Sequence, residues 1–423
     1  MIAAWLYLVL AAWGAFGTAV AVSRGRWPPG QGPLYFLVAW PVAELPLHHM
    51  ALSALVTAVF AWWGALDHWQ GWAGLAFVAA SWVLLLRLHW RSLKSQPAID
   101  CGLQEGLGAG FFQGIRPEWA AGLRAGAPLA RWVRPFRVND REHVERVKDI
   151  AYGPAGRRNR LDVYRPRGHA HGCPVLLQIH GGAWVLGRKD DQGVPLMNEM
   201  ARQGWVCVAP NYRRSPQATF PEHLIDCKLA IRWIRENIAD YGGDPGFLAV
   251  TGGSAGGHLA SLVALTANDP QYQPGFEDID TSVVAAVPFY GAFDFLEHNG
   301  EDVAQSSRPS FVERLVMKSS PRDERDEWER ASPIRCVHAE APPFFVLHGS
   351  HDSLVWPEGG RRFVAALRRV SCQPVAYAEL YGAQHAFDLF HSIRCVNAVN
   401  GVATFLAWVR STHGSGRLPE PTE

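Results

Sequence analysis

A short apolar run that ends in a glycine-serine turn constrains this chain more than any other feature. Residues 247–250 are apolar, and Gly252, Ser254 and Gly256 follow with the spacing G-x-S-x-G, before a stretch patterned like a helix. This spacing is typical of the nucleophile elbow, in which a serine sits on a sharp strand-to-helix turn. Only residues without a Cβ let the flanking backbone pass so closely. Such a turn would lift Ser254 Oγ above a sheet and direct the Ala255 amide at a reaction centre.

The motif alone is weak, because a chain of this glycine and serine content contains a chance match with a probability of roughly one in five. The alternative is a glycine-rich loop with a surface serine. The surrounding sequence has to decide between the two.

The region 147–412 alternates short apolar runs with helical patterns, which predicts a mostly parallel sheet with helices on both faces, an α/β fold. Sites in such sheets lie beyond the carboxyl ends of the strands. The predicted strands are 161–164, 175–179, 206–209, 248–250, 283–288, 344–347 and 375–379. The predicted helices are 195–203, 224–241, 256–267, 358–370 and 399–410.

A second glycine turn, His180-Gly181-Gly182-Ala183, follows the predicted strand 175–179. Small residues there let backbone N–H groups turn inward. Beside the elbow, the amides of Gly182 and Ala183 would form an oxyanion hole together with the amide of Ala255. A plain tight turn after a strand is the alternative, and His180 is expected to organise the loop.

An acid and a base follow two later strands. Asp352 comes after the strand 344–347, and His385 after the last strand. The order serine, aspartate, histidine is the one expected of α/β-hydrolases, and the chemistry needs a base near the hydroxyl and a carboxylate that holds the imidazole. His351 is a weaker candidate for the base, and Asp388 is expected to be structural.

Together these motifs resemble the α/β-hydrolase fold and, within it, the hormone-sensitive-lipase-like esterases and lipases, over about residues 147–412. The resemblance implies a carboxylic-ester hydrolase with Ser254 as nucleophile, His385 as base and then acid, and Asp352 orienting the imidazole. Ala183 departs from the family, which usually has a third glycine there, and its Cβ would narrow the acyl pocket. The resemblance implies neither a metal nor an organic cofactor. A serine peptidase of the same fold and a non-catalytic hydrolase-like binding protein are the alternatives.

The first 96 residues indicate a membrane region. Uncharged or nearly uncharged runs cover 2–22, 50–66 and 71–86, which predicts about three spanning helices. A cleaved signal peptide is disfavoured because no basic residue precedes the first run. The run 33–43 is short and contains Pro41, so a re-entrant or interfacial piece is expected. If it crossed the membrane, every later orientation would flip.

Basic residues favour a cytoplasmic position for everything after the third run. They follow the first and third runs, at Arg24, Arg26, Arg87, Arg91 and Lys94, and are missing from the loop between the second and third. Seven cysteines without framework spacing agree with a reducing compartment. With 40 basic against 39 acidic residues, the net charge implies no nucleic-acid partner. The expected partners are a small-molecule or lipid ester and membrane lipids.

Three further segments complete the predicted organisation. Residues 97–146 read as a basic amphipathic connector, either a solvated linker or a helix on anionic headgroups. Insertions near 269–280 and 295–334 would cap the site, and 413–423 would be a disordered tail. If 97–146 is only a connector, truncation to about residue 140 should release a soluble, active enzyme. The sequence leaves open the natural substrate, its acyl length and the oligomeric state.

Overall fold

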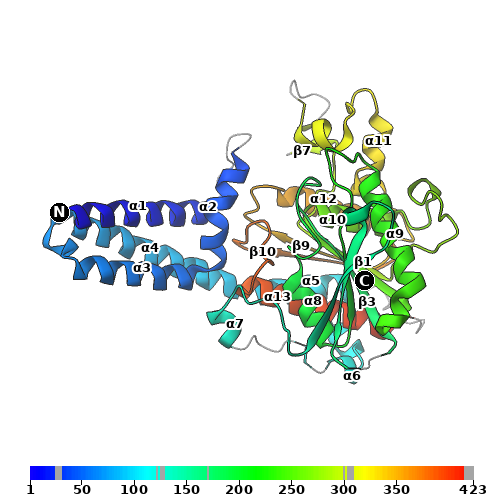
Figure 1. Cartoon of the computed structure of the whole chain (residues 1–423), viewed down its shortest axis with the longest axis horizontal. Coiled ribbons are helices and arrows are strands. Elements are labelled where there is room, and N and C mark those ends of the chain that lie inside the picture. The colour runs from blue at the N-terminus through cyan, green and yellow to red at the C-terminus, as the bar shows by residue number, and fades with distance from the viewer. Residues whose placement is uncertain are drawn as a thin grey trace.

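The computed structural model is elongated, with a helical bundle at one end and an α/β domain at the other (Figure 1). The structure describes residues 1–23, 31–120, 122–123, 129–168, 171–298, 301–302 and 309–413. Arg24, Arg26, part of the expected cap at 295–334 and nearly all of the expected tail lie outside these residues.

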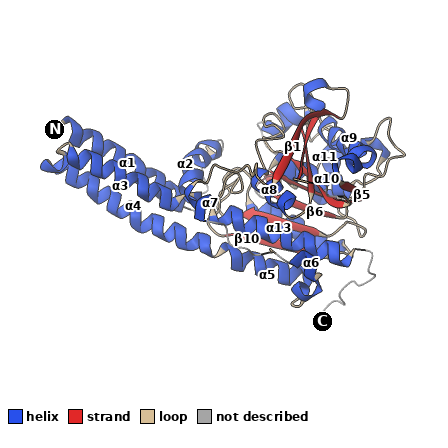
Figure 2. Ribbon diagram, turned by 60° about the horizontal axis from the view of Figure 1, so that its bottom comes forward, coloured by secondary structure: helices blue, strands red, loops and turns tan. Residues whose placement is uncertain are grey.

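Four helices form the bundle region: α1 (Ile2–Val22), α2 (Gly32–Glu44), α3 (Pro46–Trp62) and α4 (Trp69–Leu93). Helices α1, α3 and α4 lie side by side, and the amino terminus is at the end far from the α/β domain (Figures 1 and 2). By length and composition, α1 and the continuous helical stretch Trp69–Leu107 could each cross a membrane. Helices α2 and α3 meet at an angle of 89° and would count as a third span if taken as one broken helix. The expected spans 2–22 and 71–86 fall in the first two candidates, whereas the expected span 50–66 only overlaps α3, which has 17 residues and counts only together with α2.

An eight-stranded sheet forms the centre of the second domain, in the order β1-β2-β4-β3-β5-β6-β9-β10. Strands β1, β2 and β4 pair antiparallel and the remaining neighbours are parallel, which confirms the α/β fold class. The seven predicted strands all fall in this sheet. The strands are β1 (Val144–Ala151), β2 (Arg160–Pro166), β3 (Cys173–Ile179), β4 (Val206–Pro210), β5 (Gly243–Gly253), β6 (Ala285–Phe289), β9 (Phe344–Gly349) and β10 (Val375–Leu380).

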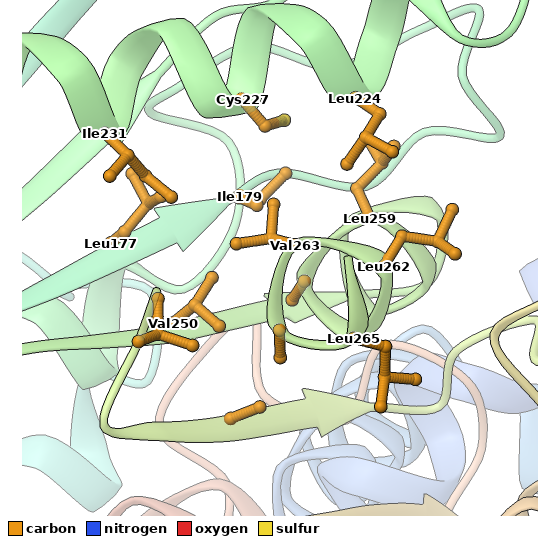
Figure 3. Packing of buried hydrophobic residues seen from close by; sticks show 14 of the residues in the cluster. Leu177, Ile179, Leu224, Cys227, Ile231, Val250, Leu259, Leu262, Val263 and Leu265 are labelled. Atoms are coloured by element: carbon orange, nitrogen blue, oxygen red, sulfur yellow. The ribbon is translucent and has the colours of Figure 1, made fainter. Parts of the chain in front are cut away.

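The two faces of the sheet bury two separate apolar clusters. In β3, Leu177 and Ile179 belong to one cluster and Leu176 to the other, because side chains alternate along a strand. Figure 3 shows the first cluster, in which leucines of α9 and α10 pack over β3 and β5. Both faces are covered, so β3 is buried throughout.

The helices divide between these faces, with α9, α10 and α12 on the first and α5, α8 and α13 on the second (Figure 1). The remaining helices and a small hairpin, β7 with β8, lie at the periphery. The bounds are α5 (Ser95–Leu107), α6 (Pro117–Ala120), α7 (Leu129–Val133), α8 (Val194–Arg202), α9 (Glu222–Asn237), α10 (Ala255–Leu265), α11 (Arg325–Arg330), α12 (Pro357–Val370), α13 (Ile393–Thr412), β7 (Glu297–His298) and β8 (Glu301–Asp302).

The connector expected over 97–146 is wrong for its first part. Helix α5 continues α4 and packs on β10 and α13, with Ile99 and Leu103 fully buried. Its glycines, which suggested a linker, are sites of close approach. A Cβ at Gly102 would lie 2.0 Å from the Tyr377 carbonyl oxygen, and one at Gly106 would lie 2.5 Å from the Ala376 Cα. The glycines therefore let a helix lie directly on a strand.

Helix α2 docks on the α/β domain through a buried ion pair. Glu44 Oε1 lies 3.0 Å from Arg394 Nη1, and both side chains are fully buried. Ser392 donates a hydrogen bond of 2.9 Å to the same carboxylate, and Arg394 also donates to the carbonyls of Ala43 and Tyr381. Removing one charge of such a pair leaves the other buried without compensation.

We expect Glu44→Gln to lower the free energy of unfolding by about 3–5 kcal/mol, because Arg394 would stay charged and buried. Thermal unfolding of the full-length protein in detergent measures the loss. Glu358→Gln is the matched control, because the Glu358–Arg361 pair is half exposed and worth at most about 1 kcal/mol. Equal shifts in the two variants would contradict the prediction.

Candidate active site

The elbow predicted from the sequence is present between β5 and α10. Ser254 adopts φ 60° and ψ −122°, a positive-φ conformation that non-glycine residues rarely take, and its amide donates to the Phe289 carbonyl at 3.0 Å. A Cβ at Gly256 would lie 2.1 Å from the Ile179 carbonyl oxygen, and one at Gly252 would lie 2.4 Å from that of Gly256. Both glycines are therefore required for the chain to turn here.

The glycine turn after β3 lies against the serine. A Cβ at Gly181 would come within 3.1 Å of the Ser254 Cβ, and the Gly181 amide donates to Gln192 Oε1 at 2.6 Å. Gly182 and Ala183 both have positive φ, at 115° and 51°. Within the described residues, their amides donate to no protein group, and the same holds for the amide of Ala255. Three unoccupied donors thus lie on the two turns that meet at Ser254.

His180 organises this loop, as the sequence predicts. Its Nδ1 donates to the Gly181 carbonyl at 2.7 Å, and its ring stacks on Tyr212 at 4.3 Å between centroids. Tyr212 in turn donates to the His180 carbonyl. Burial lowers the pKa of His180 to about 4, so the ring is neutral near pH 7.

The structure brings the predicted acid and base together at the carboxyl ends of β9 and β10. His385 Nδ1 and Asp352 Oδ2 are 2.6 Å apart, and both side chains are buried. His348 Nε2 lies 3.4 Å from the same oxygen. Burial alone would raise the pKa of Asp352, but the neighbouring His385 and His348 outweigh it and hold that pKa well below its usual range. Asp352 is therefore ionised beside the imidazole.

The other carboxylate oxygen of Asp352 is fixed by the backbone. Asp352 Oδ1 accepts hydrogen bonds from the amides of Leu354 and Val355, at 2.9 and 2.8 Å. The alternative base, His351, instead contacts the Tyr381 ring edge-on at 5.8 Å. Of the histidines near Asp352, His385 makes the shortest contact with its carboxylate, 2.6 Å against 3.4 Å for His348.

Tyr290 links the elbow to the base, and sequence reasoning missed it. Its ring lies 4.5 Å from the His385 ring, and a Cβ at Gly253 would be 2.7 Å from its hydroxyl oxygen. Tyr290 donates a hydrogen bond to Asp388, whose pKa is raised by burial, so Asp388 has the structural role expected of it. The sequence offered one clue to Tyr290: it directly follows strand β6, at the edge of the sheet where functional side chains gather.

No hydrogen bond between Ser254 and His385 is present in the described part of the chain.

A second contact that the sequence did not reveal comes from the bundle. Phe36 of α2 approaches the His385 ring edge-on, with centroids 6.1 Å apart. Across the described ranges, His, Cys, Asp and Glu side chains form no group of three suited to a metal ion.

Comparison with known proteins identifies the family. The chain is 45% identical over 359 residues to the probable carboxylic ester hydrolase LipM of Mycobacterium tuberculosis, with 81% of each chain covered. The chain belongs to the hormone-sensitive-lipase-like esterases. It is a carboxylic-ester hydrolase that acts on small-molecule esters. Since 81% of the chain is more than the α/β domain contains, the similarity to LipM extends into the region before residue 147.

Other relatives of this esterase agree. Esterase LipQ of Mycobacterium tuberculosis is 50% identical over 268 residues, which is 63% of each chain. The family model described as BD-FAE matches residues 161–367. Among solved structures, the butyrate-bound esterase of Thermogutta terrifontis matches with a TM-score of 0.50 and 25% identity, over 65% of this chain and 96% of that chain. Because this family consists of esterases, the chain is an esterase and neither a serine peptidase nor a non-catalytic binding protein.

We expect Gly256→Ala to abolish ester hydrolysis and to destabilise the esterase by about 1–3 kcal/mol, because the new Cβ would overlap the Ile179 carbonyl. Thermal unfolding and hydrolysis of a p-nitrophenyl ester measure both effects. Gly359→Ala is the control: it lies in α12 with no atom within 4 Å of the new Cβ, and it should stabilise the protein by up to about 1 kcal/mol. Full activity in Gly256→Ala would refute the steric account of the elbow.

Proposed function

We propose that Ser254 is the nucleophile, His385 the general base and then acid, and Asp352 the residue that orients the imidazole. Ser254 Oγ attacks the ester carbonyl carbon while His385 Nε2 takes the hydroxyl proton. The tetrahedral intermediate collapses, and the alcohol leaves with the proton that His385 returns to it. A water, deprotonated by His385, then attacks the acyl-enzyme, and Ser254 Oγ leaves with that proton as the acid is released.

The single observation that carries this proposal is the buried 2.6 Å contact between His385 Nδ1 and Asp352 Oδ2. An ionised carboxylate on Nδ1 fixes the tautomer whose Nε2 accepts a proton, and it stabilises the imidazolium that forms. Tyr290 lies against both the His385 ring and Gly253 of the elbow, so the proposed base and the elbow share one neighbour. Hydrogen bonds between a serine and its base are often long without substrate and tighten when it binds.

The amides of Gly182, Ala183 and Ala255 are the proposed oxyanion donors. They lie on two turns in contact at Ser254, and Ala255 begins α10, where the helix dipole favours negative charge. Donors held by the backbone need no rearrangement as charge develops on the carbonyl oxygen. Alanine at 183 supplies its N–H as glycine would, while its methyl group occupies space near the acyl side.

The segment 295–334 is proposed to cover this site. Phe295 packs edge-on against Trp184, at 5.2 Å, directly after the glycine turn. His258 of α10 donates to the Ala331 carbonyl at 2.8 Å and stacks on Phe295. These contacts of Phe295 and Ala331, near the two ends of the segment, support a cap over the oxyanion loop that would select the acyl group. The segment 269–280 belongs to the same proposed cap.

The bundle is proposed to anchor the esterase in a membrane, with lipid esters among its substrates. Many large apolar side chains of α1, α3 and α4 are exposed, a pattern that water would oppose and lipid would favour. At the end of α4 nearest the α/β domain, a cavity of about 540 Å³ is lined by Arg87, Trp90, Arg91, Lys94 and Tyr381. Cations beside an interfacial tryptophan suit the headgroups of anionic lipids.

We expect Ser254→Ala to lower kcat on the order of a million-fold, because the nucleophile is lost. Hydrolysis of a p-nitrophenyl ester measures the rate, and circular dichroism verifies the fold. Ser261→Ala is the matched control on α10, since its hydroxyl donates to the Gly257 carbonyl of its own helix, and its activity should stay within a few-fold of wild type. A Ser254→Ala enzyme with a tenth of the normal rate would sink the assignment.

The hydrolase domain is proposed to face the cytoplasm, because Arg87, Arg91 and Lys94 lie at its end of α4 while the opposite end holds no lysine or arginine. The right-angle bend between α2 and α3 supports three crossings rather than four. We expect a green fluorescent protein fused after Glu423 to fluoresce and an alkaline phosphatase fused there to be inactive. Both fusions should remain in the pellet after alkaline carbonate washing. Strong phosphatase activity without fluorescence would place the domain outside.

A further inference from the structure

Helix α2 carries a stripe of residues at four-residue spacing that faces the loops of the proposed acid and base. The stripe consists of Gly32, Phe36, Trp40 and Glu44, and residues four apart share one face of a helix. Each member contacts the esterase domain between residues 352 and 395. The helix therefore touches the acid loop, the base and the start of α13 in turn.

At the first position, α2 lies in backbone contact with the acid loop. A Cβ at Gly32 would lie 2.5 Å from the Ser353 carbonyl oxygen, and Ser353 Oγ donates to the Gly32 carbonyl at 3.4 Å. Ser353 directly follows Asp352. Glycine is thus needed for the helix to reach this loop.

At the second position, the helix reaches the base itself. Two rings contact the imidazole of His385: Tyr290 from the sheet, at 4.5 Å, and Phe36 from α2, at 6.1 Å with an interplanar angle of 82°. An edge-to-face contact prefers one relative orientation of the two rings. Asp352 fixes one atom of the imidazole, and the two rings limit its tilt.

At the third position, α2 fixes the backbone beside the base. Trp40 Nε1 donates to the Ala386 carbonyl at 3.0 Å, and the indole packs on Phe390 at 5.1 Å. Ala386 has φ 57°, which costs a residue with a Cβ about 1–2 kcal/mol and persists only where the surroundings hold it. Trp40 thus braces a strained peptide adjacent to His385.

We propose that α2 is a positioning element of the active site, in which Phe36 and Trp40 hold the His385 imidazole in the orientation that accepts the Ser254 proton. The proposal rests on the triad proposed above. It makes hydrolysis depend on a helix that belongs in sequence to the membrane region. A misplacement of about 1 Å at such a group can cost on the order of a hundredfold in rate.

The test uses the full-length esterase in detergent micelles. We expect Phe36→Ala to lower kcat for p-nitrophenyl butyrate by about 10- to 100-fold with little change in KM, because the base is misplaced while the substrate still binds. Labelling of Ser254 by a fluorophosphonate should slow in parallel. Phe36→Tyr keeps the ring and should restore most of the rate, and Trp40→Phe should lower kcat because the Ala386 carbonyl loses its donor. Leu37→Ala is the matched control on the same helix, with a side chain 64% exposed, and should stay within twofold of wild type.

The inference is overturned if folded Phe36→Ala and Trp40→Phe both keep kcat within twofold of Leu37→Ala, or if Phe36→Ala lowers only the melting temperature. Should Phe36→Ala not fold, Phe36→Leu fills the volume without a ring and is judged by the same criterion. Ser254→Ala is assayed in parallel to separate the two proposals. Hydrolysis or probe labelling in Ser254→Ala would remove the triad, whereas an inert Ser254→Ala beside a fully active Phe36→Ala would remove only the role of α2.

Discussion

The close approach of three backbone segments at the elbow is the constraint on which the site depends. Gly252 and Gly256 leave no room for a Cβ, because the end of β5 and the start of α10 cross at van der Waals distance over the end of β3. That crossing forces Ser254 into positive φ and presents its hydroxyl above the sheet. It also places the turn after β3 against the serine, so the proposed nucleophile and the proposed oxyanion donors meet at one packing contact. Neither the serine nor the turn after β3 could move without separating the central strands.

The parallel arrangement of the sheet then supplies the remaining groups. Strands β5, β6, β9 and β10 are neighbours and end at the same edge, so Ser254, Tyr290, Asp352 and His385 gather there despite their separation in sequence. Within this edge, the acid and base are held differently. Asp352 is fixed by backbone amides on its own loop, whereas His385 is braced from outside by rings of β6 and α2.

The sequence predicts the parts of the site that local chemistry determines. The elbow and the loop at His180 are steric signatures, and strand ends locate Asp352 and His385 once the alternation of strands and helices is recognised. The sequence predicts the wrong structure where a glycine serves close approach of the backbone and not flexibility. Gly102 and Gly106 resemble linker residues, yet they are the face by which α5 lies on β10. Whether a glycine serves flexibility or close approach depends on a partner strand more than 250 positions away.

The role of α2 is hidden for a similar reason. Pro41 and Glu44 make the run 33–43 a poor membrane span, and the right-angle bend agrees with that expectation. A charged residue in an apolar run suggests an interface with water, but here the carboxylate is fully buried against Arg394, about 350 residues later in the chain. No local pattern distinguishes a glutamate that faces water from one that pairs inside the protein.

These contacts predict that the α/β domain will not fold alone after truncation near residue 140, contrary to what a plain connector over 97–146 would allow. Truncation there would remove Ile99, Leu103 and Leu107 from the second core and expose the β10 face that they cover. Burial of one large apolar side chain contributes about 1.5–3 kcal/mol to the free energy of unfolding. Phe111 and Ile115 would be lost together with these three side chains. The summed loss of stability approaches the whole stability of an ordinary domain, about 5–15 kcal/mol. It would also leave Arg394 without Glu44 and His385 without Phe36. Two helices join the bundle to the esterase: α2, which contacts the loops of Asp352 and His385, and the continuous α4–α5, which packs on β10. The helical bundle and the candidate active site therefore form one structural unit, in which the first hundred residues complete the fold of the last three hundred.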